Sequence, residues 1–545
     1  MLTTHPGRSI QLALCFALLE GCSGGGSDSA SSNSPANLPG VPPAPTGLVS
    51  AASTFSTNCA GVLNPGTLYV NAEVEPQLAI NPANPNNLVG TWQQDRWSNG
   101  ASRGIAVGVS FDAGSTWATR ALPVSRCGGG NVANGGDFER ASDPWVTFSP
   151  NGVAYQLSLG VSGTEFQAGA SSAMLVSRSS DGGRTWAHPL ALIRDGAEFF
   201  NDKNTITADP TDSRYVYAVW DRLTTDNRGP TFFTRTIDGG ASWEPAHAIF
   251  DPGVGSQTIG NIVAVLPDGT LVNFFTQLKS GGTVSTGNFA VIRSSDKGAT
   301  WSQPTVVASF LGIGSRDPET GSAIRDSAFL GQISVGAQGQ LYVVWQDARF
   351  SNGVRDAIAF TSSTDGGVSW SAPVRVNGDA SVQGLIPSIS ARADGTIGVS
   401  YFDMRSNTAD PATLPIDFWL ATSRDGVNWT DQRIAPAFDL AAAPIARGYF
   451  LGDYMGLTSD GANFYPFYVR TNSGNPANQT DVYMTPVKLA KGAVSAAVAA
   501  SAADVSVTPM AAEFQRRVHD NINQKIAQRV PGWMRAKALH ATQPP

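Results

Sequence analysis

The chain has 545 residues, of which 14% are charged, and its formal net charge at pH 7 is −7. Because no long run of Lys or Arg occurs, this balance argues against binding to nucleic acid or to an anionic membrane surface. Glycine (58 residues), proline (34) and tryptophan (13) are abundant, which favours an all-β fold of short strands and tight turns over a helical bundle.

The N-terminus has the features of an export signal. The apolar stretch at 10–19 is too short to span a bilayer and is typical of a secretory signal. The sequence LEGC at 19–22 resembles a bacterial lipoprotein cleavage box, which predicts a signal peptide at 1–22 and lipidation of Cys22. Glu20 is unusual in such a box, so a plain signal peptide is the alternative. We expect an extracytoplasmic protein, either an envelope lipoprotein held to the membrane only by its lipid or a secreted protein.

The segment behind the signal separates it from the first strands. Residues 23–58 are rich in Gly, Ser and Pro and are predicted to form a flexible tether. Cys59 and Cys127 remain as one pair in an oxidising compartment, so we expect a disulfide between them. Two unconnected thiols are the alternative.

A two-strand pattern recurs seven times along the rest of the chain. Each copy has an extended apolar segment, a turn rich in Pro, Asp, Asn or Gly, and a second extended segment that ends near an aromatic residue. The copies begin at residues 76, 143, 204, 261, 332, 387 and 453. Alternation of short strands and turns at this spacing predicts antiparallel hairpins.

A Trp-ended turn follows the first six copies. SFDAGSTW at 110–117 is the first and SSDGGRTW at 179–186 the second, and the aspartates recur every 57–69 residues. In a hairpin turn Asp accepts backbone N–H groups, Gly supplies a positive φ, and Trp buries a large ring. We therefore predict a structural role for the six aspartates, which are Asp112, Asp181, Asp238, Asp296, Asp365 and Asp425.

Each unit is thus predicted to contain four antiparallel strands, and a ring of such units hides the sheet edges. We predict a β-propeller over residues 59–489. Seven blades are favoured, because seven two-strand copies occur; six blades with an extra hairpin are the alternative. The last unit has only three strands, and residues 67–74 are predicted to supply its fourth.

In an up-and-down blade the Trp-ended turns share one rim, and the loops after the second strand or before the first share the other. Four arginines stand on that other rim at the ends of second strands, each just after an Asp. Their guanidiniums either converge to bind an anion such as a carboxylate or form salt bridges that clamp neighbouring blades. The four are Arg96, Arg222, Arg349 and Arg405.

The S-x-D-x-G-x-T-W turns resemble the Asp boxes, or BNR repeats, of the sialidase (neuraminidase) superfamily, over roughly residues 75–489. The box also occurs in propellers of other glycosidases and of non-enzymatic secreted proteins. In sialidases, which are six-bladed, the active site lies on the rim opposite the boxes. Three arginines hold the carboxylate of the sugar there, an Asp is the acid/base, and a Tyr activated by a Glu is the nucleophile.

Carried onto this sequence, the resemblance implies Tyr454 as nucleophile, Asp143 or Asp202 as acid/base, and Glu198 or Glu319 as the partner of Tyr454. The chain lacks the early Arg-Ile-Pro segment that usually supplies the first sialidase arginine. The implied function is an exo-glycosidase (a glycoside hydrolase) acting on sialylated or other acidic glycans. The alternative is a non-catalytic cell-surface propeller that binds carbohydrate or protein.

Other chemistries have little support in the sequence. Only His188 and His247 fall within the blades, so no His cluster for zinc is present. The Asp-rich loops offer oxygen ligands of the kind that Ca²⁺ takes, but no EF-hand spacing supports a structural calcium site. We expect no metal and no cofactor, a glycan or glycoprotein as partner, and a monomer.

The C-terminal part changes in composition. Residues 490–509 are rich in Ala and are predicted to be a linker. Within 510–545 an apolar residue recurs at every fourth position until Pro531, which predicts an amphipathic helix followed by a tail. We expect the helix to pack on the propeller or on a partner, and we assign it no chemistry. The apolar positions are Met510, Phe514, Val518, Ile522, Ile526 and Val530.

Overall fold

The structure is a computed structural model that describes residues 47–488, except 57, 60, 61, 63–65 and 282–284, together with residues 510–529. The predicted signal peptide with Cys22, the predicted linker at 490–509 and the tail beyond residue 529 lie outside the described residues. The described part is nearly all β.

The first sheet contains nine strands. These are β1 (Leu68–Tyr69), β2 (Val74–Ile80), β3 (Leu88–Trp97), β4 (Ser102–Ser110), β5 (Ala118–Ala121), β6 (Arg140–Phe148), β7 (Ala154–Ser162), β8 (Ser171–Ser179) and β9 (Leu190–Asp195). A single residue pair, Ser102 with Ala141, joins β4 to β6, so the sheet consists of two antiparallel groups, β2–β5 and β6–β9. The short β1 extends the ladder that β2 makes along β3.

Five four-stranded antiparallel sheets follow. Their strands are β10 (Phe199–Ala208), β11 (Val216–Thr224), β12 (Thr231–Thr236), β13 (His247–Phe250), β14 (Ser256–Val265), β15 (Leu271–Lys279), β16 (Thr286–Ser294), β17 (Thr305–Ser309), β18 (Gln332–Val335), β19 (Leu341–Asp347), β20 (Ala357–Ser363), β21 (Val374–Arg375), β22 (Gly384–Ala391), β23 (Ile397–Asp403), β24 (Pro415–Ser423), β25 (Thr430–Asp439), β26 (Gly456–Ser459), β27 (Asn463–Thr471), β28 (Thr480–Met484) and β29 (Val487–Lys488). In the last sheet both β28 and β29 pair with β27. Short 3₁₀ helices occupy Val132–Asn134, Arg349–Ser351 and Leu440–Ala442, and the α-helix α1 spans Ala512–Arg529.

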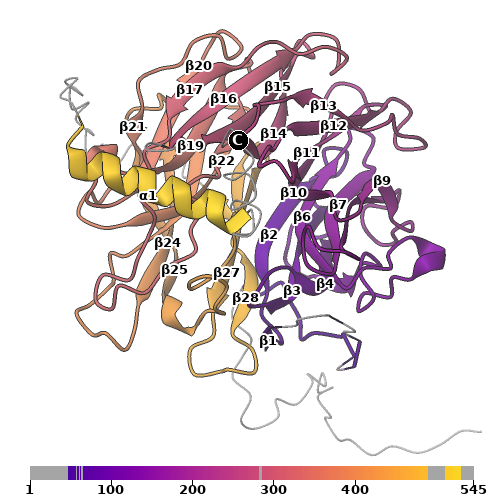
Figure 1. The fold of residues 1–545 in the computed structure, drawn as a ribbon, viewed down its shortest axis with the longest axis horizontal. Coiled ribbons are helices and arrows are strands. Elements are labelled where there is room, and N and C mark those ends of the chain that lie inside the picture. The colour runs from indigo at the N-terminus through magenta and orange to yellow at the C-terminus, as the bar shows by residue number, and fades with distance from the viewer. Residues whose placement is uncertain are drawn as a thin grey trace, which may run out of the picture. The chain divides into compact units, whose positions relative to one another are not determined.

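The first strands of successive groups lie side by side. β2 packs beside β6, β6 beside β10, and the series continues through β14, β18 and β22 to β26, which packs beside β2. The groups therefore close into a ring with their first strands at the centre (Figure 1). Closure covers the sheet edges that an isolated group would expose, and this arrangement is consistent with the predicted β-propeller.

Tryptophans on second strands fill the space between neighbouring sheets. Trp92 of β3, Trp220 of β11 and Trp345 of β19 are fully buried. A buried indole needs a hydrogen-bond acceptor, and the chain supplies one in each case: Trp220 Nε1 donates to Asn201 Oδ1 at 2.7 Å, and Trp345 Nε1 donates to Asp347 Oδ2 at 2.7 Å. The aromatic residues that end the second strands thus hold adjacent sheets together.

The six turns that resemble Asp boxes, called Asp boxes below, connect third and fourth strands. In the first box, Asp112 accepts hydrogen bonds from Ser110 Oγ at 2.8 Å, from the Thr116 N–H at 2.9 Å and from Thr116 Oγ1 at 2.6 Å. Trp117 Nε1 donates to the Gly114 carbonyl at 3.1 Å. The hydroxyl-to-Asp bond recurs at Asp181, Asp238, Asp296, Asp365 and Asp425. The oxygens of these carboxylates accept hydrogen bonds from within their own turns, so the aspartates stabilise the hairpins.

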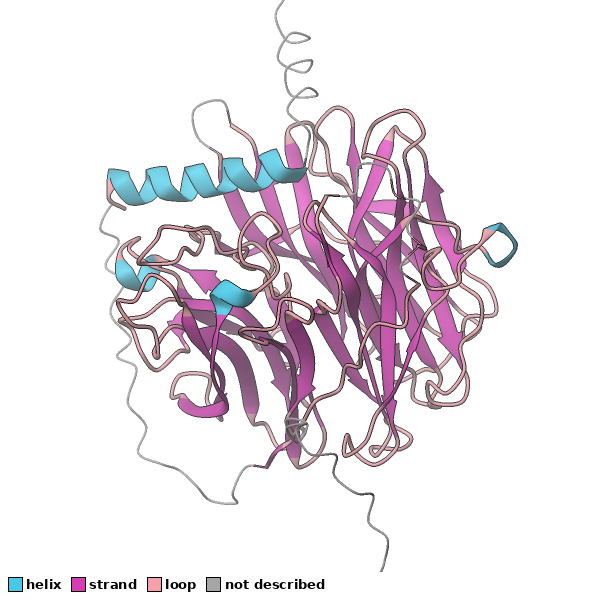
Figure 2. Ribbon diagram, turned by 90° about the horizontal axis from the view of Figure 1, so that it is seen from below, coloured by secondary structure: helices cyan, strands magenta, loops and turns pink. Residues whose placement is uncertain are grey.

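The Asp-box turns share a rim with the turns between first and second strands. Asn87 Nδ2 donates to the Gly182 carbonyl at 2.9 Å, and the Gly239 N–H donates to the Arg214 carbonyl at 2.9 Å. The loops that enter first strands and leave second strands are at the opposite ends of the same strands. They therefore lie on the other rim, where α1 also lies, roughly across the strands (Figure 2).

The segment before β1 completes the last sheet. Leu48 pairs antiparallel with Tyr483 of β28, and the side chain of Val49 is buried. The Val49 N–H donates to the Val482 carbonyl at 2.9 Å. The first and last groups of strands are thereby joined by residues from the two ends of the described propeller.

This closure corrects two predictions. Residues 67–74 do not form a full fourth strand of the last unit, because β1 and the start of β2 pair with β3; a single parallel bridge, Ala72 with Thr480 of β28, joins this segment to the last sheet. The flexible tether does not extend to residue 58, because residues 47–50 pack on β28. The apolar pair Leu48–Val49 inside an otherwise polar segment explains both results, since burying it along β28 removes apolar surface from water.

A disulfide fixes the same segment further along. Cys59 and Cys127 are bonded, with their Cα atoms 5.0 Å apart. Arg103 of β4 contacts this segment, because its Nη2 donates to Cys59 Sγ at 2.9 Å and its Nη1 forms an ion pair with Asp95 at 3.1 Å. The N-terminal segment is therefore held to the propeller on two sides.

The C-terminal helix packs on the sheets by its apolar stripe. Phe514, Val518, Ile522 and Ile526 are buried in one cluster with side chains of β14–β20. None of the helices in the described ranges has the length and apolar character that a membrane crossing requires.

Candidate functional site

Three first strands carry the same local distortion near the centre of the ring. Glu75, Asp143 and Lys203 have φ values of 54°, 48° and 48°, and the register of β2, β6 and β10 shifts at these points. A positive φ is uncommon for residues other than Gly, and a bulge redirects a side chain. The distortion repeats at Gly260 and Ile386 in β14 and β22, so it belongs to the repeat.

The distorted positions bring three charged side chains together. Lys203 Nζ lies 2.7 Å from Asp143 Oδ1 and 3.4 Å from Glu75 Oε1. It also lies 2.7 Å from Asp453 Oδ2, in the loop before β26. Arg325 Nε donates to the other oxygen of Asp453 at 2.8 Å. Lys203 and these three carboxylates are buried, and we call them, together with Arg325, the central charge cluster.

Burial and pairing pull the pKa values of the cluster apart. Burial raises the pKa of Glu75 to about 8 in spite of the Lys203 charge. Burial alone would also raise the pKa of Asp453, but the charges of Arg325 and Lys203 outweigh it and hold that pKa well below its usual range. Burial would lower the pKa of Lys203, but its carboxylate neighbours keep it well above the ordinary value. The cluster thus contains one carboxyl that holds its proton easily and one that is ionised.

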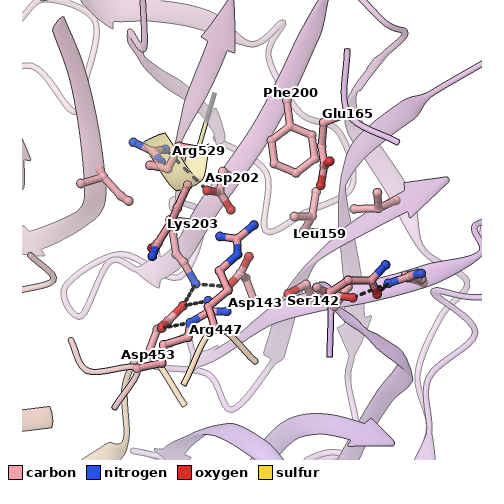
Figure 3. A pocket seen from close by; sticks show the side chains of 18 of the residues that line it. Ser142, Asp143, Leu159, Glu165, Phe200, Asp202, Lys203, Arg447, Asp453 and Arg529 are labelled. Atoms are coloured by element: carbon pink, nitrogen blue, oxygen red, sulfur yellow. Dashed lines mark hydrogen bonds and ion pairs between the residues drawn. The ribbon is translucent and has the colours of Figure 1, made fainter. Parts of the chain in front are cut away.

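A pocket of about 380 Å³ opens above the central charge cluster (Figure 3). It lies on the rim opposite the Asp boxes, and the strand ends and loops of that rim form most of its wall. Seven cationic and four acidic side chains line it. The cationic ones are Arg96, Arg140, Lys203, Arg325, Arg447, Lys525 and Arg529, and the acidic ones are Asp143, Glu165, Asp202 and Asp453.

Three arginines approach one another in this pocket. The guanidinium carbons of Arg96 and Arg325 lie 4.8 Å and 4.3 Å from the ring centre of Phe450. Arg447 stands in the same loop as Phe450 and has a φ of 68°, a strained conformation for Arg that often marks a functional position. Although Arg447 is exposed at the surface, desolvation by the surrounding protein and the charge of Arg325 lower its pKa. Among the described residues, Arg447 has no hydrogen-bond or ion-pair partner, so its guanidinium is available to a ligand.

Of the four arginines predicted on this rim, only Arg96 lines the pocket. Arg222 Nε donates to Asp195 at 2.8 Å, Arg349 Nη2 lies 2.7 Å from Asp347, and Arg405 Nε donates to Asp403 at 2.6 Å. The predicted convergence of several of these guanidiniums is therefore wrong. Arg222 fits the alternative, a salt bridge between neighbouring blades, because it links β11 to β9. Arg349 and Arg405 bind carboxylates of their own sheets, since each follows its Asp by two residues.

Tyr454 is packed under the pocket and does not line it. Its side chain is buried, its hydroxyl donates to the Pro144 carbonyl at 3.1 Å, and its ring meets Trp145 edge-on at 5.2 Å. Burial, together with the charges of Glu75 and Asp143, raises the pKa of Tyr454 well above its ordinary value. A tyrosine in this state is a poor nucleophile, because the phenolate is disfavoured.

The predicted carboxylates divide into two groups. Asp143 and Asp202 both line the pocket, so the structure brings the two candidate acid/base residues together. Glu198 and Glu319 are exposed, and Glu319 accepts a hydrogen bond from Asn407 Nδ2 at 2.8 Å. Neither of these two is among the charges that act on Tyr454. In the part of the chain that the structure describes, no three His, Cys, Asp or Glu side chains are grouped to hold a metal ion.

Sequence reasoning missed much of this site, although the repeat contains a signal for it. Glu75, Asp143 and Lys203 each stand seven residues before a turn proline, at Pro82, Pro150 and Pro210. Aligning the first strands on those prolines would have placed the three side chains at one height around the axis. Other site residues come from irregular loops and from α1, where no repeat signal exists; they include Arg325, Arg447, Asp453, Lys525 and Arg529.

No protein-family model matches the sequence, and a comparison with curated protein sequences finds no match. Solved structures similar to this chain include a Hadza microbial sialidase, with 19% identity and a TM-score of 0.42 over 61% of this chain and 63% of that one. A Dyadobacter fermentans protein of unknown function has 14% identity and a TM-score of 0.43 over 79% of this chain and 98% of that one. The Fusarium graminearum α-L-arabinofuranosidase has 13% identity and a TM-score of 0.41 over 62% of this chain and 91% of that one. Sialidases, to which the Asp boxes bear a resemblance, are thus among the structures similar to this chain, at a level that assigns it no activity.

Proposed function

We propose that this protein is an extracytoplasmic, seven-bladed β-propeller that binds an acidic sugar of a glycan, holding the sugar's carboxylate in the pocket above the central charge cluster. Seven first strands in a closed cycle support the blade number. A disulfide between Cys59 and Cys127 is typical of an oxidising compartment outside the cytoplasm.

The observation that carries the proposal is the charge of the pocket. Seven cationic side chains line the pocket, in a chain whose net charge is −7. Among the described residues, Lys203, Arg325, Lys525 and Arg529 are paired with carboxylates, whereas Arg447 is not, and an unpaired guanidinium in a concave site attracts an anion. Guanidinium groups match a carboxylate with two parallel hydrogen bonds, and Arg447 forms no hydrogen bond or ion pair with another described side chain.

The walls of the pocket fit a sugar ring. A volume of about 380 Å³ lies within the usual range for small-molecule sites. Leu159, Val161, Phe200, Ile259 and Phe329 supply apolar wall beside the charged side chains. A sugar acid has one anionic group and C–H faces that pack on apolar side chains, so it suits this mixed lining.

Binding should be measured by titration calorimetry with N-acetylneuraminic acid and D-glucuronic acid, using their methyl esters as neutral counterparts. We expect the acids to bind more tightly than the esters. Replacing Arg447 with Gln should weaken binding of the acid about tenfold or more, because a charge-assisted hydrogen bond is lost, and should leave ester binding unchanged.

Arg214→Gln is the matched control, because Arg214 lies on the Asp-box rim and forms an exposed ion pair with Asp212. The Arg214→Gln variant should bind the acids as tightly as the wild-type protein does. Equal binding of acids and esters, or an Arg447→Gln variant that binds like the wild type, would refute the proposal.

Hydrolysis of a glycoside is the second candidate function, favoured by the two carboxyls at the pocket. Burial raises the pKa of Asp202, whereas Arg325 and Lys203 overcome burial and keep the pKa of Asp453 low. A protonated and an ionised carboxyl in one site are what glycoside hydrolysis requires. Asp202 is the proposed acid.

Release of 4-methylumbelliferone from its N-acetylneuraminic acid and glucuronic acid glycosides tests this activity. Asp202→Asn should lower kcat about 100-fold, while Tyr454→Phe should keep the wild-type rate because that hydroxyl is bonded to Pro144. Loss of activity in Tyr454→Phe would instead support the tyrosine mechanism that the resemblance implies. Absence of release by the wild-type protein would leave the binding function alone.

A further inference from the structure

The last turns of α1 form part of the pocket wall. Lys525, Gln528 and Arg529 line the pocket together with residues from the propeller loops. All other lining residues among the described ones come from the region between Arg96 and Asp453. A segment outside the repeated sheets therefore takes part in the site.

The helix is held over this rim by contacts along its whole length. Its apolar stripe is buried against the sheets, Asn521 Nδ2 donates to the Gly312 carbonyl at 2.8 Å, and the Ser285 N–H donates to His519 Nδ1 at 2.7 Å. These contacts determine where the C-terminal end of α1 lies, and so they place Arg529 at the pocket.

Arg529 is packed between two acidic side chains. Its guanidinium bonds to Asp221 and lies 3.5 Å from Asp202 Oδ2. Its Nη1 also donates to Gln257 Oε1 at 3.2 Å and to the Thr258 carbonyl at 3.1 Å. Asp221 is fully buried, and without Arg529 the carboxyl groups of Asp221 and Asp202 would lose the cation that faces both of them. Arg529 thus decides the sign of the charge on this wall of the pocket.

Lys525 acts in the same sense one turn earlier. Its ammonium lies 3.3 Å from Asp326 Oδ1 and 4.8 Å from the ring centre of Phe329. Without Lys525 and Arg529, five cationic side chains would face four acidic ones in the pocket, and both Asp326 and Asp221 would lose their cationic partners.

We propose that α1 is a component of the ligand site, and that Arg529, supported by Lys525, makes the pocket selective for anions. This inference rests on the proposed function, because it names the residue that decides which charge the site accepts. Removal of Arg529 converts the wall at Asp202 and Asp221 from an anion-accepting surface into a cation-accepting one.

The experiment is a titration of full-length Arg529→Ala and Arg529→Lys with two probes, N-acetylneuraminic acid and the cationic amino sugar D-glucosamine. Arg529→Ala should bind the acid about tenfold more weakly or worse and should gain measurable affinity for glucosamine, whose ammonium takes the place of the guanidinium. Arg529→Lys should restore acid binding and exclude glucosamine. If Arg529 had only a structural role, its loss would weaken binding of the acid without creating a preference for glucosamine.

Arg516→Gln is the matched control on the same helix, since Arg516 is exposed and pairs with Glu513 and Asp520 of that helix. If Arg529→Ala does not fold, Lys525→Met replaces it, with an expected loss of several-fold in acid affinity. Unchanged affinities in these variants, or tighter acid binding after loss of the charge, would overturn the inference. If the wild-type protein binds no acid, the proposed function fails, but a gain of glucosamine binding by Arg529→Ala would still establish the role of α1.

Discussion

Replacing Lys203 with Met is expected to lower the free energy of unfolding by about 3–5 kcal/mol, the usual cost of removing one partner from a buried ion pair. Lys203 lies within 3.4 Å of carboxylates from Glu75, Asp143 and Asp453. Without the ammonium, these carboxyl groups would remain together near the axis of the ring, with Arg325 as the described cation in direct contact. Urea denaturation followed by tryptophan fluorescence measures the change.

The loss should be smaller at pH 5 than at pH 8, because carboxyls without Lys203 take up protons and lose their repulsion. Lys279→Met is the control, since Lys279 is exposed at the end of β15, and it should change the free energy of unfolding by less than about 0.5 kcal/mol. A Lys203→Met variant as stable as this control would show that the carboxyls are already neutral in the native state.

Removing the disulfide with the double variant Cys59→Ser/Cys127→Ser is expected to cost about 4 kcal/mol. The bond closes a loop between residues 68 apart, and the entropy that an open loop of this length regains in the unfolded chain accounts for that amount. The variant should unfold at a lower urea concentration than the oxidised wild-type protein.

Wild-type protein treated with dithiothreitol serves as the control and should unfold together with the double variant. An unfolding midpoint that does not depend on the reductant would mean that the unfolded chain is held compact by other contacts. The same variant should keep its affinity for acidic sugars once folded, because neither cysteine lines the pocket.

The fold could be predicted from the sequence because the same pattern of strands and turns recurs in each unit. Hydrogen bonds at Asp112 and its equivalents are local, so the residues of one box suffice to predict its turn. The ring follows from the number of strand pairs and from the need to cover sheet edges. The closing segment was missed because the pairing of Leu48 with Tyr483 depends on a partner far away in the chain.

The candidate site was less accessible for a related reason. Asp143 and Asp202 could be named because they precede strands in the repeat, and Arg96 because it ends one. Arg222 stands at a similar position, yet its guanidinium forms an ion pair with Asp195 on the neighbouring blade. Sequence spacing reveals which rim a residue occupies, but competition among nearby carboxylates decides whether it faces the axis.

The joining of the first and last blades also links folding to the order of synthesis. Ser50 Oγ donates to Asp481 Oδ1, and the two residues are 431 positions apart. Contacts between such distant residues form late, because a long stretch of chain must first be brought together. Under the proposed export, the chain can therefore pass through a translocation channel while the ring is still open, and the ring closes only after the final blade has emerged.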